Sequence, residues 1–317
     1  MTKLVRTIIA LTAIQLWLTP GLCAATSVEL VLSSEAHYYQ KVAEVVTDQL
    51  RTLKPEVPIH RRILNSGHGG PPVREGSLVV AIGSGATREA FARYPQANVL
   101  ALLIPMTLWL DLNPPARENR HFAAVVIDQP LERAVLLGKL LKPEAQRFGA
   151  VFGPATEAIQ SSSLARVKAM GIDLRTEKLP PNANPISVLR AAIETSDVFV
   201  AVPDRADFNR NVAKWVLRLS FRDKVPVIGF SSSYAEAGAL ASIYSSPENV
   251  GRHGAELLAR RLDDSGAGSD SGDAEWRAHY PRYYTLQVNE DVARVLGIAV
   301  PPLEQLYRMY QNALQAM

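Results

Sequence analysis

Two segments of the sequence decide the fold: SDVFVAVPD at residues 196–204, and KVPVIGFSSSYAEAGALASIYSSPENVGRHGAELLARRL at residues 224–262. Each contains a short apolar run bounded by turn residues, which is typical of a strand buried on both faces of a sheet. Between the two runs, apolar residues recur at helical spacing from Phe208 to Leu219. Strand, helix and strand in this order predict a βαβ unit, and therefore a parallel sheet.

Strands and helices are expected to alternate over most of the remaining chain. Apolar runs that suit strands occur at residues 28–32, 57–64, 78–82, 99–104, 123–127, 148–152, around 174, at 239–244 and at 283–288. Residues 105–120 have few periodic positions and include Pro114 and Pro115, so we expect an irregular connection there. The alternation as a whole is the pattern of a doubly wound α/β protein.

Several motifs resemble those of a known family. Besides the VPD and PVIG strand ends, the chain has DQP at 128–130, GALA at 238–241, PENVGR at 247–252 and NEDVARVLGIAVP at 289–301. In this order they resemble the type I periplasmic substrate-binding proteins of ABC transporters, and above all those related to tryptophan and tyrosine uptake. The resemblance covers about residues 123–300. The residues before this range match the family only in the alternation of strands and helices.

The resemblance implies a particular division of the chain. We expect an α/β type I periplasmic-binding-protein fold, in which two doubly wound parallel-sheet lobes are joined by a three-crossing hinge. The crossings are placed near residues 118–122, 244–247 and 280–283. Residues 26–120 and 246–282 would then form lobe 1, and residues 121–245 and 283–317 would form lobe 2.

The first 25 residues have the pattern of a secretory signal peptide. Lys3 and Arg6 precede an apolar run at residues 11–18, which is shorter than the roughly 20 residues needed to span a bilayer. An uncleaved anchor is the alternative. Cys23 could also be the lipidated residue of a lipoprotein, but the residues before it do not fit that signal. We therefore expect cleavage after Ala25 and a periplasmic location.

Charge and cysteine content argue against several classes of protein. The chain has 34 basic and 31 acidic residues, and removal of the signal peptide leaves 32 against 31, a net charge of +1. No stretch combines lysine and arginine with aromatic residues, so nucleic acid is not an expected partner. The six histidines are scattered, and Cys23 is the only cysteine. We therefore expect no metal site and no cofactor.

Two further motifs could carry chemistry. The sequence GSGATR at 83–88 opens a helix and could bind an anion at the helix N-terminus, or it could be a tight turn alone. It lacks the third glycine of a dinucleotide-binding motif. Three serines follow the strand that ends at Phe230, but no nucleophile elbow surrounds them. We therefore expect a protein that is not an enzyme, with a secreted α/β hydrolase as the alternative of a different class.

The expected ligand site lies in the cleft between the lobes, where strand carboxyl ends converge. Hydroxyl groups dominate the candidates, which suits a small polar or zwitterionic ligand. The candidates from lobe 1 are Ser33, Ser34, Tyr39, Ser84 and Thr87, and those from lobe 2 are Thr156, Asp204, Phe230 and Ser231. Replacement of Asp204 by alanine is expected to weaken binding roughly tenfold while the fold survives.

One departure from the family concerns the ligand. Members that bind aromatic amino acids carry a glutamate and an asparagine in the loop after the first strand of the second lobe, where this chain has GPATEA at 153–158. The resemblance therefore does not extend to an amino-acid ligand. It implies a monomer that captures a small ligand and delivers it to an ABC permease. A periplasmic sensor that works with a kinase or another envelope receptor is the alternative.

Overall fold

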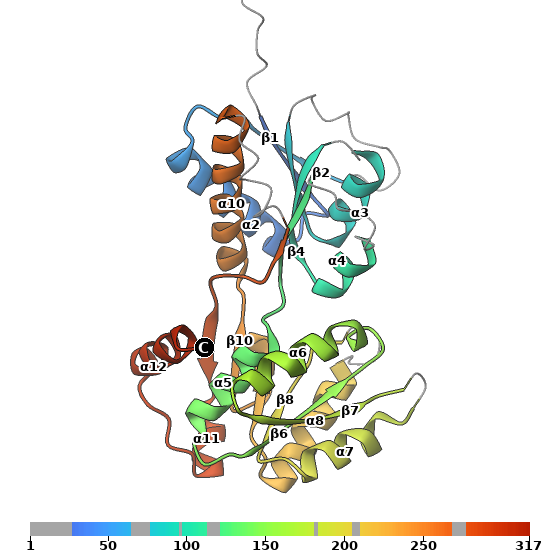
Figure 1. Ribbon diagram of the computed structural model, residues 1–317, viewed down its shortest axis with the longest axis vertical. Coiled ribbons are helices and arrows are strands. Elements are labelled where there is room, and N and C mark those ends of the chain that lie inside the picture. Colours follow the sequence, from blue (N-terminus) through green and yellow to red (C-terminus); the bar gives the residue numbers. More distant parts are fainter. Residues whose placement is uncertain are drawn as a thin grey trace, which may run out of the picture.

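The computed structural model describes residues 27–64, 77–94, 97–112, 121–180, 183–204, 210–267 and 277–317. Within these ranges the chain forms two six-stranded sheets, and the two lobes built on them lie one above the other along the long axis (Figure 1). The predicted α/β architecture with two doubly wound lobes is confirmed. The predicted signal peptide at residues 1–25 lies outside the described residues.

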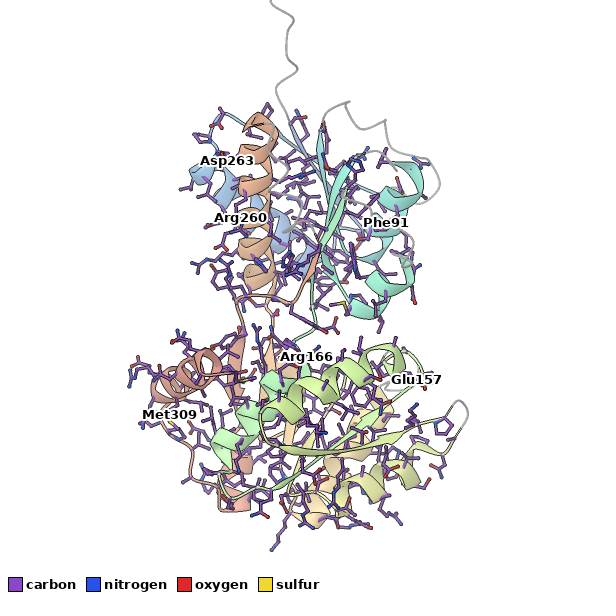
Figure 2. The ribbon with its side chains drawn as sticks, in the orientation of Figure 1. Phe91, Glu157, Arg166, Arg260, Asp263 and Met309 are labelled. Atoms are coloured by element: carbon purple, nitrogen blue, oxygen red, sulfur yellow. The ribbon has the colours of Figure 1, made fainter. Side chains whose placement is uncertain are left out.

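Lobe 1 is built on a parallel sheet with the strand order β11-β5-β4-β3-β1-β2. Its strands are β1 (Val28–Leu32), β2 (Ile59–Ile63), β3 (Leu78–Ile82), β4 (Asn98–Ile104), β5 (Phe122–Val126) and β11 (Ala278–His279). Helices α2 (His37–Leu53) and α10 (Pro247–Ala267) cover one face, while α3 (Ser84–Arg93) and α4 (Met106–Leu112) cover the other. Phe91 of α3, labelled in Figure 2, belongs to the apolar core on this second face.

Lobe 2 has a sheet with the order β12-β10-β9-β8-β6-β7, in which only β12 runs antiparallel to its neighbour. Its strands are β6 (Arg147–Phe152), β7 (Asp173–Lys178), β8 (Val198–Val200), β9 (Val227–Gly229), β10 (Ala241–Tyr244) and β12 (Thr285–Val288). Its helices are α5 (Leu131–Leu141), α6 (Glu157–Ala169), α7 (Pro185–Glu194), α8 (Arg210–Asp223), α9 (Ser232–Glu236), α11 (Glu290–Leu296) and α12 (Leu303–Gln315).

The central strands are buried on both faces, as their continuous apolar sequences require. All five residues of β1, β3 and β5 are buried, as are all three of β8 and β9. In lobe 2, α5, α11 and α12 pack on one face of the sheet and α7, α8 and α9 on the other. Each sheet therefore separates two apolar layers, which is why these central strands show no polar alternation.

The chain passes between the two sheets three times, after β5, after β10 and after β11. The first of these positions corrects the sequence analysis, which placed a crossing at residues 118–122 and assigned the following strand to lobe 2. That strand is β5, which pairs with β4 in lobe 1, with Phe122 opposite Val99. The chain leaves lobe 1 only after Val126, because β5 completes the hydrogen bonding of β4 before α5 begins.

A second correction concerns the stretch expected to be irregular from residue 105 onward. Residues 106–112 form helix α4, and Leu108 and Trp109 are buried against lobe 1. The Trp109 ring meets Phe91 edge-on at a centroid distance of 6.2 Å. Burial of two large apolar side chains stabilises this short helix, although its sequence has too few turns to show helical periodicity.

Hydrogen bonds tie the three connections between the lobes to one another. The Gln129 side chain donates to Ser245 Oγ at 2.6 Å, which joins the first connection to the second. The Arg133 guanidinium donates to Gln129 Oε1 and to the carbonyl oxygen of Pro281 on the third, at 2.7 Å each. On the lobe 2 side, Arg166 of α6 lies over the Tyr280 ring at 5.9 Å, near these connections in Figure 2. The connecting segments therefore form one bonded unit.

Stability is expected to fall in mild acid because of His253 on α10. Its ring is buried, 4% exposed, and Nδ1 accepts a hydrogen bond from the Arg282 backbone N–H. Burial, with His279 and Arg282 nearby, lowers the pKa of His253 to about 4. In the unfolded chain the ring takes a proton near pH 6.5, so the folded state loses stability as pH falls from about 6.5 towards 4, by about 2 kcal/mol at pH 5.

Urea unfolding of the wild type and His253→Gln at pH 7.5 and pH 5 measures this contribution. The wild type is expected to lose about 2 kcal/mol more between the two pH values than the variant, since glutamine does not titrate. Carboxylates that also titrate contribute to both proteins and cancel in the difference. Equal losses in the two proteins would contradict the assignment.

Candidate functional site

A cavity of about 250 Å³ lies between the two lobes. Eight residues line it: Pro105, Thr107, Ile127, Asp128, Pro203, Asp204, Phe230 and Ser231. They follow the carboxyl ends of four strands, two in lobe 1 (β4 and β5) and two in lobe 2 (β8 and β9). Open α/β sheets bind ligands at this edge, because the loops there leave backbone and side-chain polar groups free to converge.

The wall from lobe 1 is shaped by an irregular strand end. Leu103 has a φ of +59°, and the pairing of β4 with β5 shifts register between Leu102 and Ile104. A left-handed conformation is costly for a branched side chain and is found mostly where surrounding structure imposes it. The bulge changes the direction of the chain just before Pro105, so that α4 begins beside the cavity with Thr107 on its lining.

Asp128 joins the ends of β4 and β5. Its Oδ2 accepts a hydrogen bond of 2.6 Å from the backbone N–H of Met106, the first residue of α4. Asp128 therefore caps α4 and not α5, the helix that follows it in sequence. The carboxylate is half-buried and lies on the wall of the cavity.

The wall from lobe 2 is organised by Asp204, which is 2% exposed. Its Oδ2 accepts hydrogen bonds from the backbone N–H and from the hydroxyl of Thr156, each at 2.9 Å. Thr156 stands at the start of α6, so Asp204 fixes that helix end to the end of β8. A Cβ on Gly153 would lie 2.6 Å from the Asp204 carboxylate, so only glycine permits this approach.

Phe230 and Ser231 complete the lobe 2 wall after β9. The Phe230 ring packs on Tyr234 with centroids 5.0 Å apart, which limits its motion. Ser231 precedes the short helix α9, and its Oγ accepts from the Tyr234 backbone N–H at 3.3 Å. Burial raises the pKa of the Tyr234 hydroxyl far above its usual value, so that group stays neutral behind the wall.

The structure brings together three of the nine residues nominated from sequence, Asp204, Phe230 and Ser231. Thr156 lies directly behind Asp204 and is 1% exposed. The five nominees from lobe 1 gather around the ends of β1 and β3 and do not line the cavity. Ser33 Oγ donates to the carbonyl oxygen of Ile82 and accepts from the Ala86 N–H, which caps α3. Thr87 is fully buried and donates to the carbonyl oxygen of Gly83.

The other lobe 1 nominees lie beside this cap. Ser34 is exposed, and its Oγ accepts from the Ala36 N–H at 3.3 Å. Ser84 is the half-buried first residue of α3, and the half-buried Tyr39 ring lies against Gly83. The glycines of the 83–88 turn are thus accounted for by close packing, since Gly83 has a φ of +89° with Tyr39 and Ser33 against it. The Ala86 N–H at this helix start is already bonded to Ser33 Oγ.

Sequence analysis missed five lining residues: Pro105, Thr107, Ile127, Asp128 and Pro203. Pro105 and Ile127 directly follow β4 and β5, and Asp128 comes one residue after Ile127. Pro203 lies three residues after β8, and Thr107 is the second residue of α4. These residues could have been nominated for the site from their positions alone, because they lie near the ends of predicted strands. Their identities gave no signal, because proline and isoleucine are ordinary turn and core residues, and an aspartate between a strand and a helix is an ordinary capping residue.

Features elsewhere in the molecule are less suited to a ligand site. A larger depression of about 770 Å³ lies on the outer side of lobe 2, where α5, α6 and the C-terminal residues meet, and lobe 1 contributes nothing to it. Within the described ranges no three His, Cys, Asp or Glu side chains gather so as to hold a metal ion. None of the helices in the described parts of the chain is long and apolar enough to cross a membrane.

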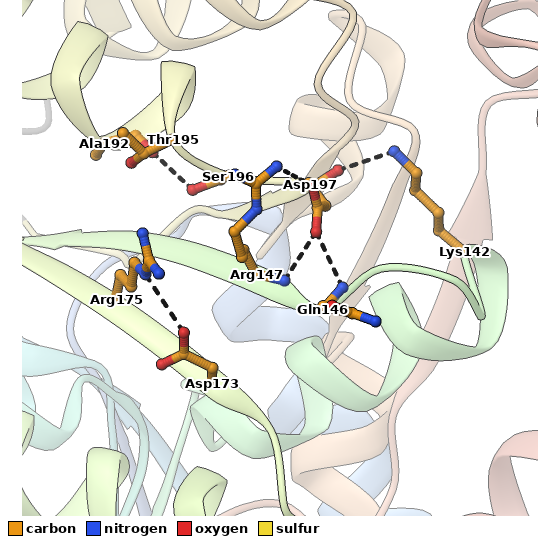
Figure 3. A network of polar contacts seen from close by, with 9 residues as sticks. All are labelled: Lys142, Gln146, Arg147, Asp173, Arg175, Ala192, Thr195, Ser196 and Asp197. Carbon is orange, nitrogen blue, oxygen red and sulfur yellow. Dashed lines mark hydrogen bonds and ion pairs between the residues drawn. The ribbon is translucent and has the colours of Figure 1, made fainter.

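The most perturbed carboxylate of lobe 2 serves the fold. Asp197 precedes β8 and accepts hydrogen bonds from the backbone N–H groups of Gln146 and Arg147 and from the Arg147 guanidinium (Figure 3). The Lys142 ammonium donates to its carbonyl oxygen. The side-chain bond from Arg147 holds the pKa of Asp197 far below its usual range. This network joins the amino ends of β6 and β8, at the opposite end of the sheet from the cavity.

Comparison with known proteins finds similarity among solved structures only. No protein-family model and no curated protein matches the sequence. An ABC domain in complex with L-Trp from Streptococcus pneumonia is 16% identical, with a TM-score of 0.55 over 89% of this chain and 98% of its own. A ligand-free, open substrate binding protein with adhesive properties from Clostridium difficile is 15% identical, with a TM-score of 0.62 over 88% and 97%.

A conserved domain protein from Vibrio cholerae gives a similar result, with 18% identity and a TM-score of 0.55 over 90% of this chain and 98% of its own. Identities this low establish the fold and nothing finer. The coverage shows that both lobes and the connections between them are shared with these structures. The chain therefore has the type I periplasmic-binding-protein fold that its sequence motifs predicted.

Proposed function

We propose that this protein captures a small ligand between its two lobes and delivers it to an ABC-type uptake permease. The observation that carries the proposal is the 250 Å³ cavity, whose lining comes from strand carboxyl ends of both lobes and from the first connection between them. A ligand held there contacts both lobes at once, so its binding free energy favours their closure. Structures with the same fold include substrate binding proteins, which supports this assignment.

The location and partners form part of the proposal. The leader at residues 1–25 would direct the chain to the periplasm, where the mature protein works as a monomer with a membrane permease. A sensor protein in the envelope would use the same cleft and the same closure. Growth on the ligand as sole source, with and without the gene, separates uptake from sensing.

A hydrolase is less well supported by the geometry. Ser231 is the only serine among the described residues of the cavity wall, and its Oγ accepts a backbone hydrogen bond at the start of α9. No histidine or lysine is among the described residues that line the cavity. A serine nucleophile requires a base within hydrogen-bonding reach. Retention of ligand binding by Ser231→Ala, without turnover by the wild type, would agree with a binding protein.

A thermal-shift screen tests the proposal, with amino acids, amines, sugars and nucleosides as probes. A probe at a hundred times its Kd is expected to stabilise the protein by about 2.7 kcal/mol. Small-angle scattering with the same probe should show a smaller radius of gyration as the lobes close. A stabilising probe that binds without any compaction would contradict capture by closure.

The Thr107→Trp substitution is expected to abolish this stabilisation, because an indole ring would fill most of the cavity. Thr107 is half-buried on the first turn of α4, so the ring can extend into the cavity while the protein stays folded. Thr52→Trp on the exposed face of α2 is the matched control and should leave binding unchanged. Equal shifts in both variants would place the ligand elsewhere.

A further inference from the structure

The charged groups on the cavity wall all have the same sign. Asp128 comes from the end of β5 and Asp204 from the end of β8, so the two carboxylates approach one cavity from opposite lobes. The other six lining residues are uncharged, and none of the described lining residues is basic. Aspartate side chains are ordinarily ionised at neutral pH. The described part of the lining therefore carries two negatively charged groups and no positively charged one.

Both carboxylates are held in fixed positions by the scaffold. Asp128 accepts from the Met106 N–H at 2.6 Å, and Asp204 accepts twice from Thr156 at 2.9 Å. Neither side chain can swing away from the cavity without breaking these bonds. The donors belong to the starts of α4 and α6, one in each lobe. When the lobes close on a ligand, the two carboxylates are carried towards it with their helices.

Closure makes the charge of the ligand decisive. Asp204 is already 2% exposed, and a closed cleft would remove Asp128 from water as well. Charge–charge interactions strengthen as water leaves a site. A cationic ligand is then attracted by both carboxylates, whereas an anion adds a third negative charge. A neutral ligand can donate hydrogen bonds to the carboxylates but brings no opposite charge.

The rest of the lining is apolar and partly aromatic. Phe230 is held against Tyr234, and Pro105, Ile127 and Pro203 supply further apolar surface. An aromatic face attracts a cation and also stacks with a flat ring. The volume of about 250 Å³ is at the small end for ligand cavities, which suits a single small molecule.

We propose that the ligand of this cleft is a small organic cation, an amine with an apolar body, and that Asp128 is the residue that selects for its charge. This inference rests on the proposed function, because it names the ligand class for the same site. It also replaces the small polar or zwitterionic ligand that the hydroxyl-rich sequence candidates favoured. Most of those hydroxyl groups cap local backbone instead of lining the cavity.

Two probe series, each with one aromatic ring and side chains of different charge, test the inference. The indole series is tryptamine, tryptophan, tryptophol and indole-3-acetate, and the phenyl series is phenethylamine, phenylalanine, phenylethanol and phenylacetate. Choline, ribose, arabinose and myo-inositol extend the screen to other shapes. Binding is measured by calorimetry on the full protein. The amine of a series is expected to bind at least about tenfold more tightly than the alcohol, which has no charge to pair with the carboxylates. It should exceed the zwitterion by a similar factor, because Asp128 and Asp204 repel the carboxylate of the zwitterion.

The Asp128→Asn variant separates the negative charge of this side chain from its hydrogen bond to Met106. The asparagine side-chain oxygen can still accept the hydrogen bond of Met106, so the start of α4 keeps its cap. The variant should bind the amine about tenfold more weakly and the alcohol with unchanged affinity. Asp291→Asn removes an equal charge from the exposed start of α11 and should change neither.

The outcomes separate the two proposals. Tightest binding by a zwitterion, alcohol, sugar or anion overturns the cationic ligand while the binding function stands. An Asp128→Asn variant that binds the amine as tightly as the wild type overturns the role of Asp128. If no probe of any charge binds a protein that unfolds cooperatively, the proposed binding function fails, and the cationic ligand fails with it.

Discussion

Replacement of Asp204 by alanine is expected to lower the free energy of unfolding by about 3 kcal/mol. The substitution removes two charge-assisted hydrogen bonds at once, those from the backbone N–H and the hydroxyl of Thr156. Thr156 is 1% exposed, so its donors would be left without these acceptors in a site that water reaches poorly. This expectation revises the one drawn from sequence, in which the same substitution affected binding and spared the fold.

Urea unfolding monitored by circular dichroism measures the effect, with two control variants. Asp204→Asn keeps an acceptor oxygen for Thr156 and should lose about 1 kcal/mol. Thr156→Val removes the hydroxyl but keeps the backbone N–H, and should fall between the two. If Asp204→Ala unfolds at the same urea concentration as the wild type, Asp204 does not hold the start of α6.

The second large effect is expected at Tyr310, on the C-terminal helix α12. Tyr310 is fully buried in the apolar layer between α12 and α5, and its hydroxyl donates to the Arg133 carbonyl oxygen at 2.9 Å. Its ring meets Tyr284 edge-on at 5.1 Å. Removal of a fully buried aromatic ring leaves a cavity, so Tyr310→Ala should lower the free energy of unfolding by about 4 kcal/mol.

Tyr310→Phe separates packing from hydrogen bonding. It keeps the ring and removes only the bond to Arg133, so a loss of about 1 kcal/mol is expected. Differential scanning calorimetry measures both variants. Because Arg133 also links two of the connections between the lobes, Tyr310→Ala should weaken ligand affinity as well. A small, equal loss of stability in both variants would show that the ring adds little to the core.

The sequence by itself determined the architecture of each lobe. Apolar runs such as 78–82 and 198–202, each followed by helical periodicity, have no polar face to turn towards water. Such strands must lie in a sheet covered on both sides, so the doubly wound α/β class follows from local pattern. The general location of the site could be predicted in the same way, since loops after parallel strands meet at one edge of the sheet.

The sequence did not determine which sheet a buried strand joins. The strand FAAVV at 122–126 is apolar on both faces and would satisfy either lobe. Its place beside β4 is decided by hydrogen bonding to residues some twenty positions earlier, from Val99 opposite Phe122 onward. Pairing of this kind is a tertiary property, so the first crossing between the lobes was placed too early.

Tertiary structure also decided which polar strand ends face the cavity. A hydroxyl at a strand end can bond to a ligand or to nearby backbone, and its sequence context is the same in both cases. Ser33 caps α3, a helix some 50 residues further along the chain. Asp204 holds Thr156 across 48 residues, and Asp128 caps α4 from the neighbouring strand. These contacts form only when two parallel strands lie side by side. The order of the strands in the sheet therefore sets the partner of each polar group.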